Sequence, residues 1–581
     1  MKIKLTRTLG YCLGVRRAMD TAFRELSRGQ GPVYSHGELI HNAPALDLLS
    51  QKGLRLWNGE PEGSIIIRAH GLPPEEQASL EASGLKVSDA TCPRVRAVQN
   101  LVAREAEAGR TVIIWGKADH PEVAGLVGHA AGRAVVAAGP GEVEELNLPA
   151  ESNILLVSQT TQDVFIWPQM TEAVLARWPG AVIKNTICEA TETRQADVRR
   201  LCGEVEALLV IGGKTSGNTA RLADIGRRAG LPTYLVETAA EVEPEWLKGL
   251  ESLGVAAGAS TSTWQIAQLL ERLRALARRN DDFSEFWPRL LRVAVLAGLY
   301  GALGLASLAM AAASLLDRPP PPILFSFFFF LATSLHLMRD LAQGRSRSQG
   351  QALRFNDPDR TVFFAKYGRP LKIYGLIAAG LAVLAAVPGG ANLIAVLLTA
   401  WLAALIYLFL PRPHGAHSLS LGRTLVGPAA LAGGWALLMV TAGSAWPPQW
   451  NGYGLLRAVF VIGAVFGPIF VLSVMGDVIG AQGDRIFGRP TLPTVYGEKT
   501  TRRLLEIFLL AWAAALAVGA LGGFLPGLAW LMILSGPVYN AFLLNPLFRN
   551  PGIYGFHFEA LLYGQLILTG LMVILWTRLP L

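Results

Sequence analysis

The apolar residues of this 581-residue chain change their pattern near residue 285, and this change constrains the fold more than any other feature. Before that point, charged and apolar residues alternate as they do in a water-soluble enzyme. Beyond it, the charges retreat into short clusters between long apolar runs. The hydrophobic content of 51% is therefore an average over two different materials. We expect two domains, over residues 1–278 and 279–581.

A unit of strand, cysteine and helix occurs three times in the first domain. Short apolar strands run into Cys12, Cys92 and Cys188, and a helical pattern directly follows each cysteine. Further strands alternate with helices between these units, which predicts an α/β fold with parallel sheets. The roughly equal spacing of the cysteines predicts three related lobes around one centre.

The position of these cysteines suits metal binding. A thiol at the start of a helix lies at the positive end of the helix dipole, which lowers its pKa and favours the thiolate. Three thiolates would hold an iron–sulfur cubane with one iron left open for substrate. Zinc bound by three cysteines and a histidine is the alternative metal, and any one of these cysteines alone is more typical of a buried structural residue. We exclude Cys202, which lies about 20 Å beyond Cys188 along the same predicted helix.

Polar residues that follow other strands predict a binding pocket for an anion. Histidines follow three of the strands, at His41, His70 and His120. The segment GGKTSGNTAR forms a glycine-rich turn between a strand and a helix, a geometry that binds phosphate. The polar side chains of this turn and of a similar later turn are Thr215, Ser216, Asn218 and Ser260.

Glu122 is the best-placed proton donor in the first domain. It lies two residues after His120, and a carboxylic acid in such a pocket suits a reaction that must protonate a leaving hydroxyl. The alternative is a carboxylate that only stabilises the start of a helix through its dipole.

Nine segments, in this order, resemble the LytB/IspH family of 4-hydroxy-3-methylbut-2-enyl diphosphate reductases over residues 1–276: YCLGVRRA, ELIHN, AHG, DATCP, DHPEV, SQTT, TICEATETRQ, KTSGNT and AGAST. The resemblance implies the last step of the non-mevalonate isoprenoid pathway. A [4Fe-4S] cluster would deliver two electrons to the allylic diphosphate, water would leave, and isopentenyl and dimethylallyl diphosphate would form. A ferredoxin or flavodoxin is the implied electron donor.

The resemblance also implies roles for individual residues. Cys12, Cys92 and Cys188 match the cluster ligands, Glu122 matches the proton-delivering carboxylate, and Thr160 matches the residue near the substrate hydroxyl. The residues that match the diphosphate contacts are His41, His70, His120, Ser216, Asn218 and Ser260. The chain departs from the family at Gly217, where a second serine is common, and at Thr193, where an asparagine is frequent. The backbone N–H of Gly217 can still face a phosphate.

Nine apolar stretches in the second domain predict an all-α membrane domain of about nine transmembrane helices. Most of them reach the ~20 residues that span the hydrocarbon core. They cover about 288–315, 321–338, 371–388, 391–410, 424–442, 455–475, 504–522, 526–546 and 558–577.

The loops after the even-numbered stretches hold nearly all of the lysine and arginine of this domain. The positive-inside rule therefore predicts a multi-pass protein of the cytoplasmic (inner) membrane with its first domain in the cytoplasm. The same loops account for much of the net charge of +8. We expect membrane lipid but no nucleic acid as a partner, because no basic patch is interleaved with aromatic residues.

Carboxylates near the predicted membrane face are candidate Mg²⁺ ligands that would hold a diphosphate, although an ordinary solvated loop is equally compatible with them. These residues are Asp340, Asp477 and Asp484. The segment GDVIGAQGDRIFGRPTLPTVYG resembles the second aspartate motif of the UbiA family of intramembrane prenyltransferases, over about residues 285–580. That resemblance implies prenyl transfer from a polyprenyl diphosphate.

The UbiA motifs are incomplete in this chain. Gly480 replaces the middle aspartate of the second motif, and the first motif reads His336, Asp340 and Gly344 where the family has one asparagine and two aspartates. Asp357 and Asp359, in FNDPDR, are candidates to replace the missing ligands. Two alternatives therefore stay open: an inactive membrane anchor that binds prenyl lipids for the second domain, and a zinc-binding protein without redox activity for the first.

Overall fold

The computed structural model describes nine segments of the chain, residues 1–277, 286–316, 321–345, 358–409, 421–443, 452–486, 490–527, 529–549 and 555–576. The chain divides into two compact units, Met1–Arg279 and Asn280–Leu581. Each unit is described by itself below.

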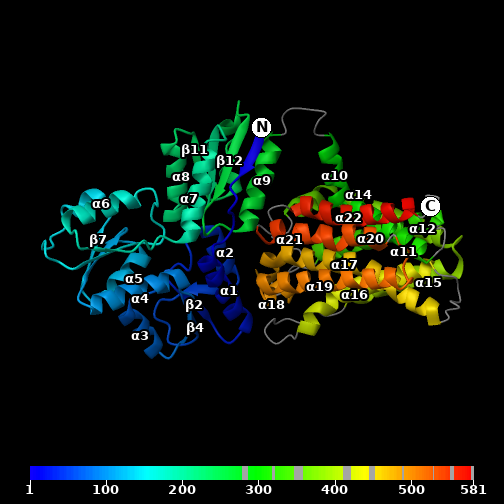
Figure 1. Cartoon of the computed structure of the whole chain (residues 1–581), viewed down its shortest axis with the longest axis horizontal. Helices are drawn as coiled ribbons and strands as arrows, with labels where there is room; N and C mark the ends of the chain where they lie inside the picture. Colours follow the sequence, from blue (N-terminus) through cyan, green and yellow to red (C-terminus); the bar gives the residue numbers. More distant parts are fainter. Residues whose placement is uncertain are drawn as a thin grey trace. The chain divides into compact units, whose positions relative to one another are not determined.

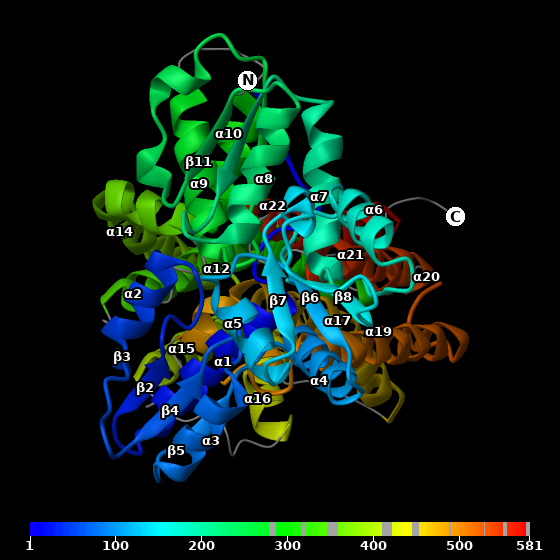
Figure 2. The ribbon, with the colours of Figure 1, turned by 90° about the vertical axis from the view of Figure 1, so that its left-hand side faces the viewer.

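The first unit contains three sheets of four strands, and every strand pairing within them is parallel. Figure 2 shows them as separate groups of strands. One sheet has the order β1 (Lys2–Leu5), β12 (Ser252–Ala257), β10 (Ala207–Ile211) and β11 (Thr233–Val236). The second has the order β3 (Leu54–Leu56), β2 (Val33–His36), β4 (Ser64–Ile67) and β5 (Lys86–Asp89). The third has the order β7 (Ala134–Ala137), β6 (Thr111–Trp115), β8 (Ile154–Ser158) and β9 (Val182–Ile183). The predicted α/β lobes with parallel sheets are confirmed.

Nine α-helices connect these strands. They are α1 (Leu13–Arg28), α2 (Ala43–Gln51), α3 (Pro74–Ala82), α4 (Pro93–Glu107), α5 (Pro121–His129), α6 (Trp167–Arg177), α7 (Glu189–Cys202), α8 (Gly217–Arg228) and α9 (Thr263–Ala277). The central strands β4, β6, β8 and β10 are almost entirely buried, because crossover helices shield both faces of a parallel sheet. This explains why their sequences are continuous apolar runs.

The three sheets repeat one arrangement that positions the cysteines. In each sheet an edge strand, β1, β5 or β9, leads to a cysteine and then directly to a long helix, α1, α4 or α7. Because the strands are parallel, the loops at their carboxyl ends lie along one edge of each sheet, where ligands gather in open α/β folds.

The second unit is helical in all of its described segments (Figure 1). Its helices are α10 (Phe286–Leu296), α11 (Leu299–Leu315), α12 (Pro322–Arg345), α14 (Pro358–Ala386), α15 (Gly390–Phe409), α16 (Leu421–Gly443), α17 (Gly452–Ile486), α18 (Leu492–Val495), α19 (Glu498–Leu521), α20 (Ala529–Ile533), α21 (Tyr539–Arg549) and α22 (Gly555–Trp576), with a π-helical segment at Leu534–Val538.

The structure supports the expected nine spans only in part. Each of the nine apolar stretches contains helix. Among the described residues, four helices are long and apolar enough to cross a membrane. The number is five if α10 and α11, which are bent by 75° relative to each other, form one broken span. Those four lie at Phe363–Ala386, Gly452–Ala481, Glu498–Leu521 and Phe558–Leu575. The other four stretches contain shorter apolar helical segments within the described residues, at Pro322–Met338, Gly390–Leu405, Pro428–Ala442 and Ala529–Leu544.

Large apolar side chains on the outside of this bundle are consistent with contact with lipid. Examples that are more than half exposed are Leu376, Leu384, Leu398, Leu510 and Phe542. Water-soluble proteins rarely expose contiguous apolar surface of this kind. Inside the bundle, Gly301, Gly304 and Gly570 let α11 and α22 approach each other closely, as small residues do between membrane helices.

Candidate active site

Three cysteines occupy equivalent positions in the three lobes. Cys12, Cys92 and Cys188 are the N-cap residues of α1, α4 and α7, and none of their side chains caps its helix with a hydrogen bond. Each cysteine N–H donates to a carbonyl in the loop after the neighbouring strand. The acceptors are Ala259 at 3.0 Å, Ala69 at 2.9 Å and Thr160 at 2.9 Å, respectively. The repeated unit of the sequence therefore extends to individual backbone hydrogen bonds.

The three N-cap cysteines lie near one another in the first unit. Cys92 interacts electrostatically with both Cys12 and Cys188. A Cβ atom added to Gly14, in the first turn of α1, would lie 2.6 Å from the Cys92 sulfur, so this close approach requires glycine. Cys202 is the last residue of α7 and packs beside the apolar cluster that includes Val198, Leu201 and Val210.

The expected lowering of the thiol pKa is wrong for Cys92. Burial raises the pKa of this thiol, and this effect outweighs the backbone N–H groups of Val95 and Arg94, which favour the thiolate. The helix start is therefore placed as expected, but desolvation dominates. A bound metal ion would itself supply the positive charge that deprotonates a coordinating thiol.

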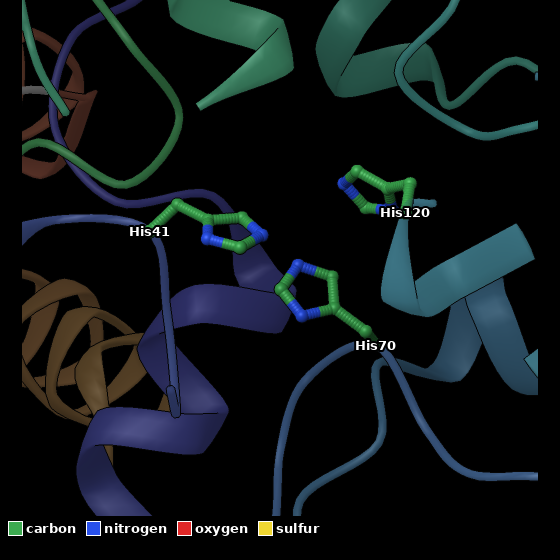
Figure 3. A group of neighbouring side chains, drawn as sticks. All are labelled: His41, His70 and His120. Atoms are coloured by element: carbon green, nitrogen blue, oxygen red, sulfur yellow. The ribbon is translucent and has the colours of Figure 1, made fainter. Parts of the chain in front are cut away.

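The rings of His41, His70 and His120 form a compact group. His41 precedes α2, His70 follows β4 and His120 is the N-cap of α5. Ring centroids are 4.7 Å apart for His41 and His70, 5.3 Å for His70 and His120, and 5.6 Å for His41 and His120. Figure 3 shows the imidazoles pointing toward one another from different loops. Among the described residues, these three histidines could together hold a metal ion, because their candidate ligand atoms all lie within 4.8 Å of one another. The sulfur atoms of the three cysteines do not form such a group.

The hydrogen bonds of these histidines define how they would meet a ligand. The backbone N–H of Glu122 donates to Nδ1 of His120 at 3.1 Å, which leaves the proton of the neutral ring on Nε2. Nδ1 of His41 lies 3.1 Å from a Glu38 carboxylate oxygen. Nε2 of His41 and Nδ1 of His70 are buried without a partner in the described structure. Buried ring nitrogens of this kind need a polar partner, either an ordered water molecule or a ligand.

The pKa values of two of these rings are low. Burial and the neighbouring histidines lower the pKa of His70 well below its ordinary value. Burial, followed by His41, lowers the pKa of His120 to about 4. Without a ligand, both rings are therefore neutral near pH 7.

A third lobe adds the start of α8 to this pocket. Ser216 caps the helix and accepts the Thr219 N–H at 3.4 Å, and both amide atoms of Asn218 are buried without a partner. The hydroxyl of Ser260 donates to the carbonyl of His41 at 2.9 Å, and a Cβ atom on Gly213 would lie 2.2 Å from that same carbonyl oxygen. A helix start and neutral imidazole N–H groups are groups that bind anions in proteins, so this arrangement is compatible with the predicted anion pocket.

Gly217 is the first residue of α8, where the sequence departs from the LytB/IspH pattern. A Cβ atom there would meet nothing within 4 Å, so the position is open. The lack of a serine side chain at this position therefore creates no packing defect, because no neighbouring side chain would have contacted it.

Glu122 is buried beside the cysteine loops and bonded to Thr160. Its two carboxyl oxygens accept the Thr160 N–H at 2.6 Å and the Thr160 hydroxyl at 2.9 Å. The carbonyl of Thr160 in turn accepts the N–H of Cys188 at 2.9 Å. Burial raises the pKa of Glu122 and outweighs the two bonds from Thr160. This arrangement holds the buried carboxyl group of Glu122 against one of the three cysteine loops.

The candidate Mg²⁺ ligands of the second unit lie on helices and not in loops. Asp477 and Asp484 both belong to α17, seven residues apart and therefore on one face of the helix. Asp340 belongs to α12, and its side chain lies outside the described part of the structure. Within the described residues, no group of three candidate ligands includes either Asp477 or Asp484. Asp357 lies outside the described residues, as does the side chain of Asp359.

Four further residues support the site and were not predicted. Gly14 and Gly213 allow the close approaches described above, and the glycine doublet before KTSG was the only local signal for the second. Asn42 caps α2 and donates to the Gln265 side chain at 3.1 Å. Arg194 is buried between cysteine loops. Long-range packing decides the roles of Asn42 and Arg194, so no local pattern marks them.

These features define a three-lobed α/β protein in which three N-cap cysteines lie near a group of three histidines. The family model described as LytB protein matches residues 3–274. A "4-hydroxy-3-methylbut-2-enyl diphosphate reductase" from Geobacter sp. (strain M21) is 39% identical over 280 residues, which cover 48% of this chain and 98% of the relative. A relative of the same name from Aquifex aeolicus (strain VF5) is 39% identical over 274 residues, 46% of this chain and 94% of the relative. The first unit therefore places this chain in the LytB protein family.

A solved structure of "(E)-4-Hydroxy-3-methyl-but-2-enyl Diphosphate Reductase, the Terminal Enzyme of the Non-Mevalonate Pathway" is 36% identical. It aligns with a TM-score of 0.38, over 47% of this chain and 100% of the solved chain.

Proposed function

We propose that the first unit, over residues 1–278, reduces 4-hydroxy-3-methylbut-2-enyl diphosphate to isopentenyl and dimethylallyl diphosphate. The observation that carries this proposal is the meeting of three N-cap cysteines from separate lobes at one centre, beside a buried proton donor and an anion pocket. The names of relatives that align along nearly their whole length support the same reaction.

The thiol set fits a [4Fe-4S] cluster better than a single zinc ion. Tetrahedral zinc with Zn–S bonds of about 2.3 Å would bring its sulfur ligands to about 3.8 Å from one another. The sulfurs of Cys12, Cys92 and Cys188 do not gather within 4.8 Å as a group. When bound, the cluster would supply the two electrons of the reaction. The ultimate donor of these electrons would be a ferredoxin or a flavodoxin.

The anion pocket would bind the diphosphate. His120 would donate through Nε2, while His41 and His70 offer buried nitrogens that have no partner in the described structure. Contacts from the α8 side would come from Ser216, the Gly217 N–H, Asn218 and Ser260. Such contacts would orient the allylic hydroxyl toward Thr160 and Glu122.

Glu122 and Thr160 would move the proton that the reaction needs. The carbon–oxygen bond of the allylic hydroxyl breaks, two electrons enter, one proton leaves with the hydroxyl as water, and a second proton reaches the carbon skeleton. Glu122, which burial keeps protonated to higher pH than an exposed glutamate, would deliver the first proton through the Thr160 hydroxyl at 2.9 Å.

Anaerobic purification of the full chain tests this proposal. We expect a brown protein that has an absorbance band near 400 nm, contains about four irons per chain, as a cubane does, and forms both products with a chemical or protein electron donor. A colourless protein with one zinc per chain and no turnover would contradict the assignment.

We propose that the second unit, over residues 279–581, anchors the reductase in the cytoplasmic membrane with the first unit in the cytoplasm. The apolar helices and their exposed leucines support insertion into lipid, including binding of a prenyl lipid. Prenyl transfer is the second candidate, supported by the resemblance of the α17 region to the UbiA family. The missing motif aspartates favour the anchor.

Membranes that contain the full chain separate these two functions. We expect the protein to stay with the membrane after a carbonate wash, and to release no diphosphate from a polyprenyl diphosphate with Mg²⁺ and aromatic acceptors. Mg²⁺-dependent release above that of membranes without the protein would establish the transferase instead.

A further inference from the structure

Arg194 is a buried arginine that connects two of the cysteine loops. It lies on α7, six residues after Cys188, and is 3% exposed. Its Nη2 donates to the carbonyl of Gly10 at 2.7 Å, two residues before Cys12, and its Nη1 donates to the carbonyl of Ala190 at 3.1 Å. The guanidinium therefore joins segments from two different lobes at the thiol site.

The positive charge of Arg194 has no carboxylate bonded to it. In the described structure the acceptors bonded to its Nη atoms are both backbone carbonyls, and its Nε is buried without an acceptor. The nearby Asp197 accepts the N–H of Thr8 at 3.0 Å. Burial lowers the pKa of Arg194, and the groups whose charge opposes this effect are Cys12 and Cys188, followed by Asp197. A buried charge is costly without a counter-charge, and the thiol site is where that counter-charge would arise.

The fold of a lobe does not itself require an arginine at this position. The residues six positions after Cys12 and Cys92 are Ala18 and Val98, and both are buried apolar side chains on the equivalent helices α1 and α4. Among the three equivalent positions, the one after Cys188 carries a charge. The difference points to a role at the site and not in helix packing.

We propose that Arg194 is a positioning residue that compensates the negative charge of the Cys12 and Cys188 thiolates and of the cluster they would hold. This inference rests on the proposed function of the first unit. A fixed positive charge and an N–H donor near the cluster sulfurs favour the reduced, more negative state, so Arg194 would raise the reduction potential. It would thereby set which electron donors are able to reduce the site.

Three variants of the full chain, prepared anaerobically, test this role. Arg194→Met removes the charge at similar length, Arg194→Lys keeps the charge, and Arg200→Met removes an exposed arginine from the same helix. The readouts are iron per chain and the cluster potential, followed at about 400 nm in a redox titration. For Arg194→Met we expect about a tenfold lower ratio of reduced to oxidised cluster at a fixed potential, about 59 mV for a one-electron couple. Arg194→Lys should retain most of the wild-type ratio, and Arg200→Met all of it.

The outcomes separate charge from packing. If Arg194→Met binds no iron but Arg194→Lys does, the charge is required and the proposal is supported. An unchanged potential in Arg194→Met with full iron content would overturn it, as would equal losses in the Met and Lys variants. Iron-free wild-type protein would instead refute the proposed function, and the inference about Arg194 would fall with it.

Discussion

Replacement of Cys92 by serine is expected to remove the iron and to lower reductase activity by roughly 10³-fold or more, the scale seen when an essential catalytic group is lost. Cys92 interacts with both other cysteines, and the first turn of α1 packs against its sulfur through Gly14. Serine has nearly the same shape, so the packing is kept. Its hydroxyl is a poor substitute for the soft thiolate that iron–sulfur clusters require.

Cys202→Ser is the matched control for this experiment. Cys202 is half-buried at the end of α7 beside apolar side chains, and we place it outside the site. Iron per chain, absorbance near 400 nm and anaerobic turnover should match the wild type in Cys202→Ser and collapse in Cys92→Ser. Equal iron content and activity in the two variants would refute the role assigned to Cys92.

Glu122→Gln is expected to lower kcat by about 10² to 10⁴-fold, the usual contribution of general acid catalysis, while iron content stays unchanged. Glutamine keeps the shape of the side chain and an oxygen that can accept the Thr160 N–H, so the cysteine loops should hold their position. What it lacks is the transferable proton. Glu107→Gln, at the exposed end of α4, is the control for loss of a carboxylate. Wild-type turnover in Glu122→Gln would exclude Glu122 as the proton donor.

Glu122 also determines how the reductase activity is expected to change with pH. Burial raises the pKa of Glu122, so the protonated, donating form persists to higher pH than in an exposed glutamate. Activity should therefore fall as pH rises through this raised pKa, and the residual activity of Glu122→Gln should lack that decline. Measurement of kcat/KM across pH for both proteins checks the assignment, and identical profiles would contradict it.

The local order of the chain predicted the three lobes well because each signal is local. An apolar strand, a cysteine and an amphipathic helix follow one another directly, and parallel pairing then places every cysteine at the same end of its sheet. The equivalence of Cys12, Cys92 and Cys188 as N-cap residues follows from that order alone. The positions of His41, His70 and His120 after strands were a local signal of the same kind, and the three rings lie together as expected.

The second unit shows where local pattern is insufficient. Apolar composition predicts helices in all nine stretches, yet it does not distinguish a continuous span from the 75° bend between α10 and α11. Asp477 and Asp484 read as loop residues because polar and glycine residues surround them, but α17 continues through both. Packing against neighbouring helices overrides the weak local preference of glycine and aspartate at these positions.

Both the local sequence and the tertiary packing determine the structure around the three cysteines. The order of residues determined which side chains stand at helix starts and strand ends, since backbone geometry is a short-range property of the chain. The tertiary structure decided how the lobes meet: Gly14 against Cys92, Gly213 against the His41 carbonyl, Glu122 on Thr160, and Arg194 between the loops of Cys12 and Cys188. It also decided that burial raises the pKa of Cys92, against the expectation from the helix dipole. Desolvation and packing depend on neighbours distant in the chain, so only the folded molecule determines them.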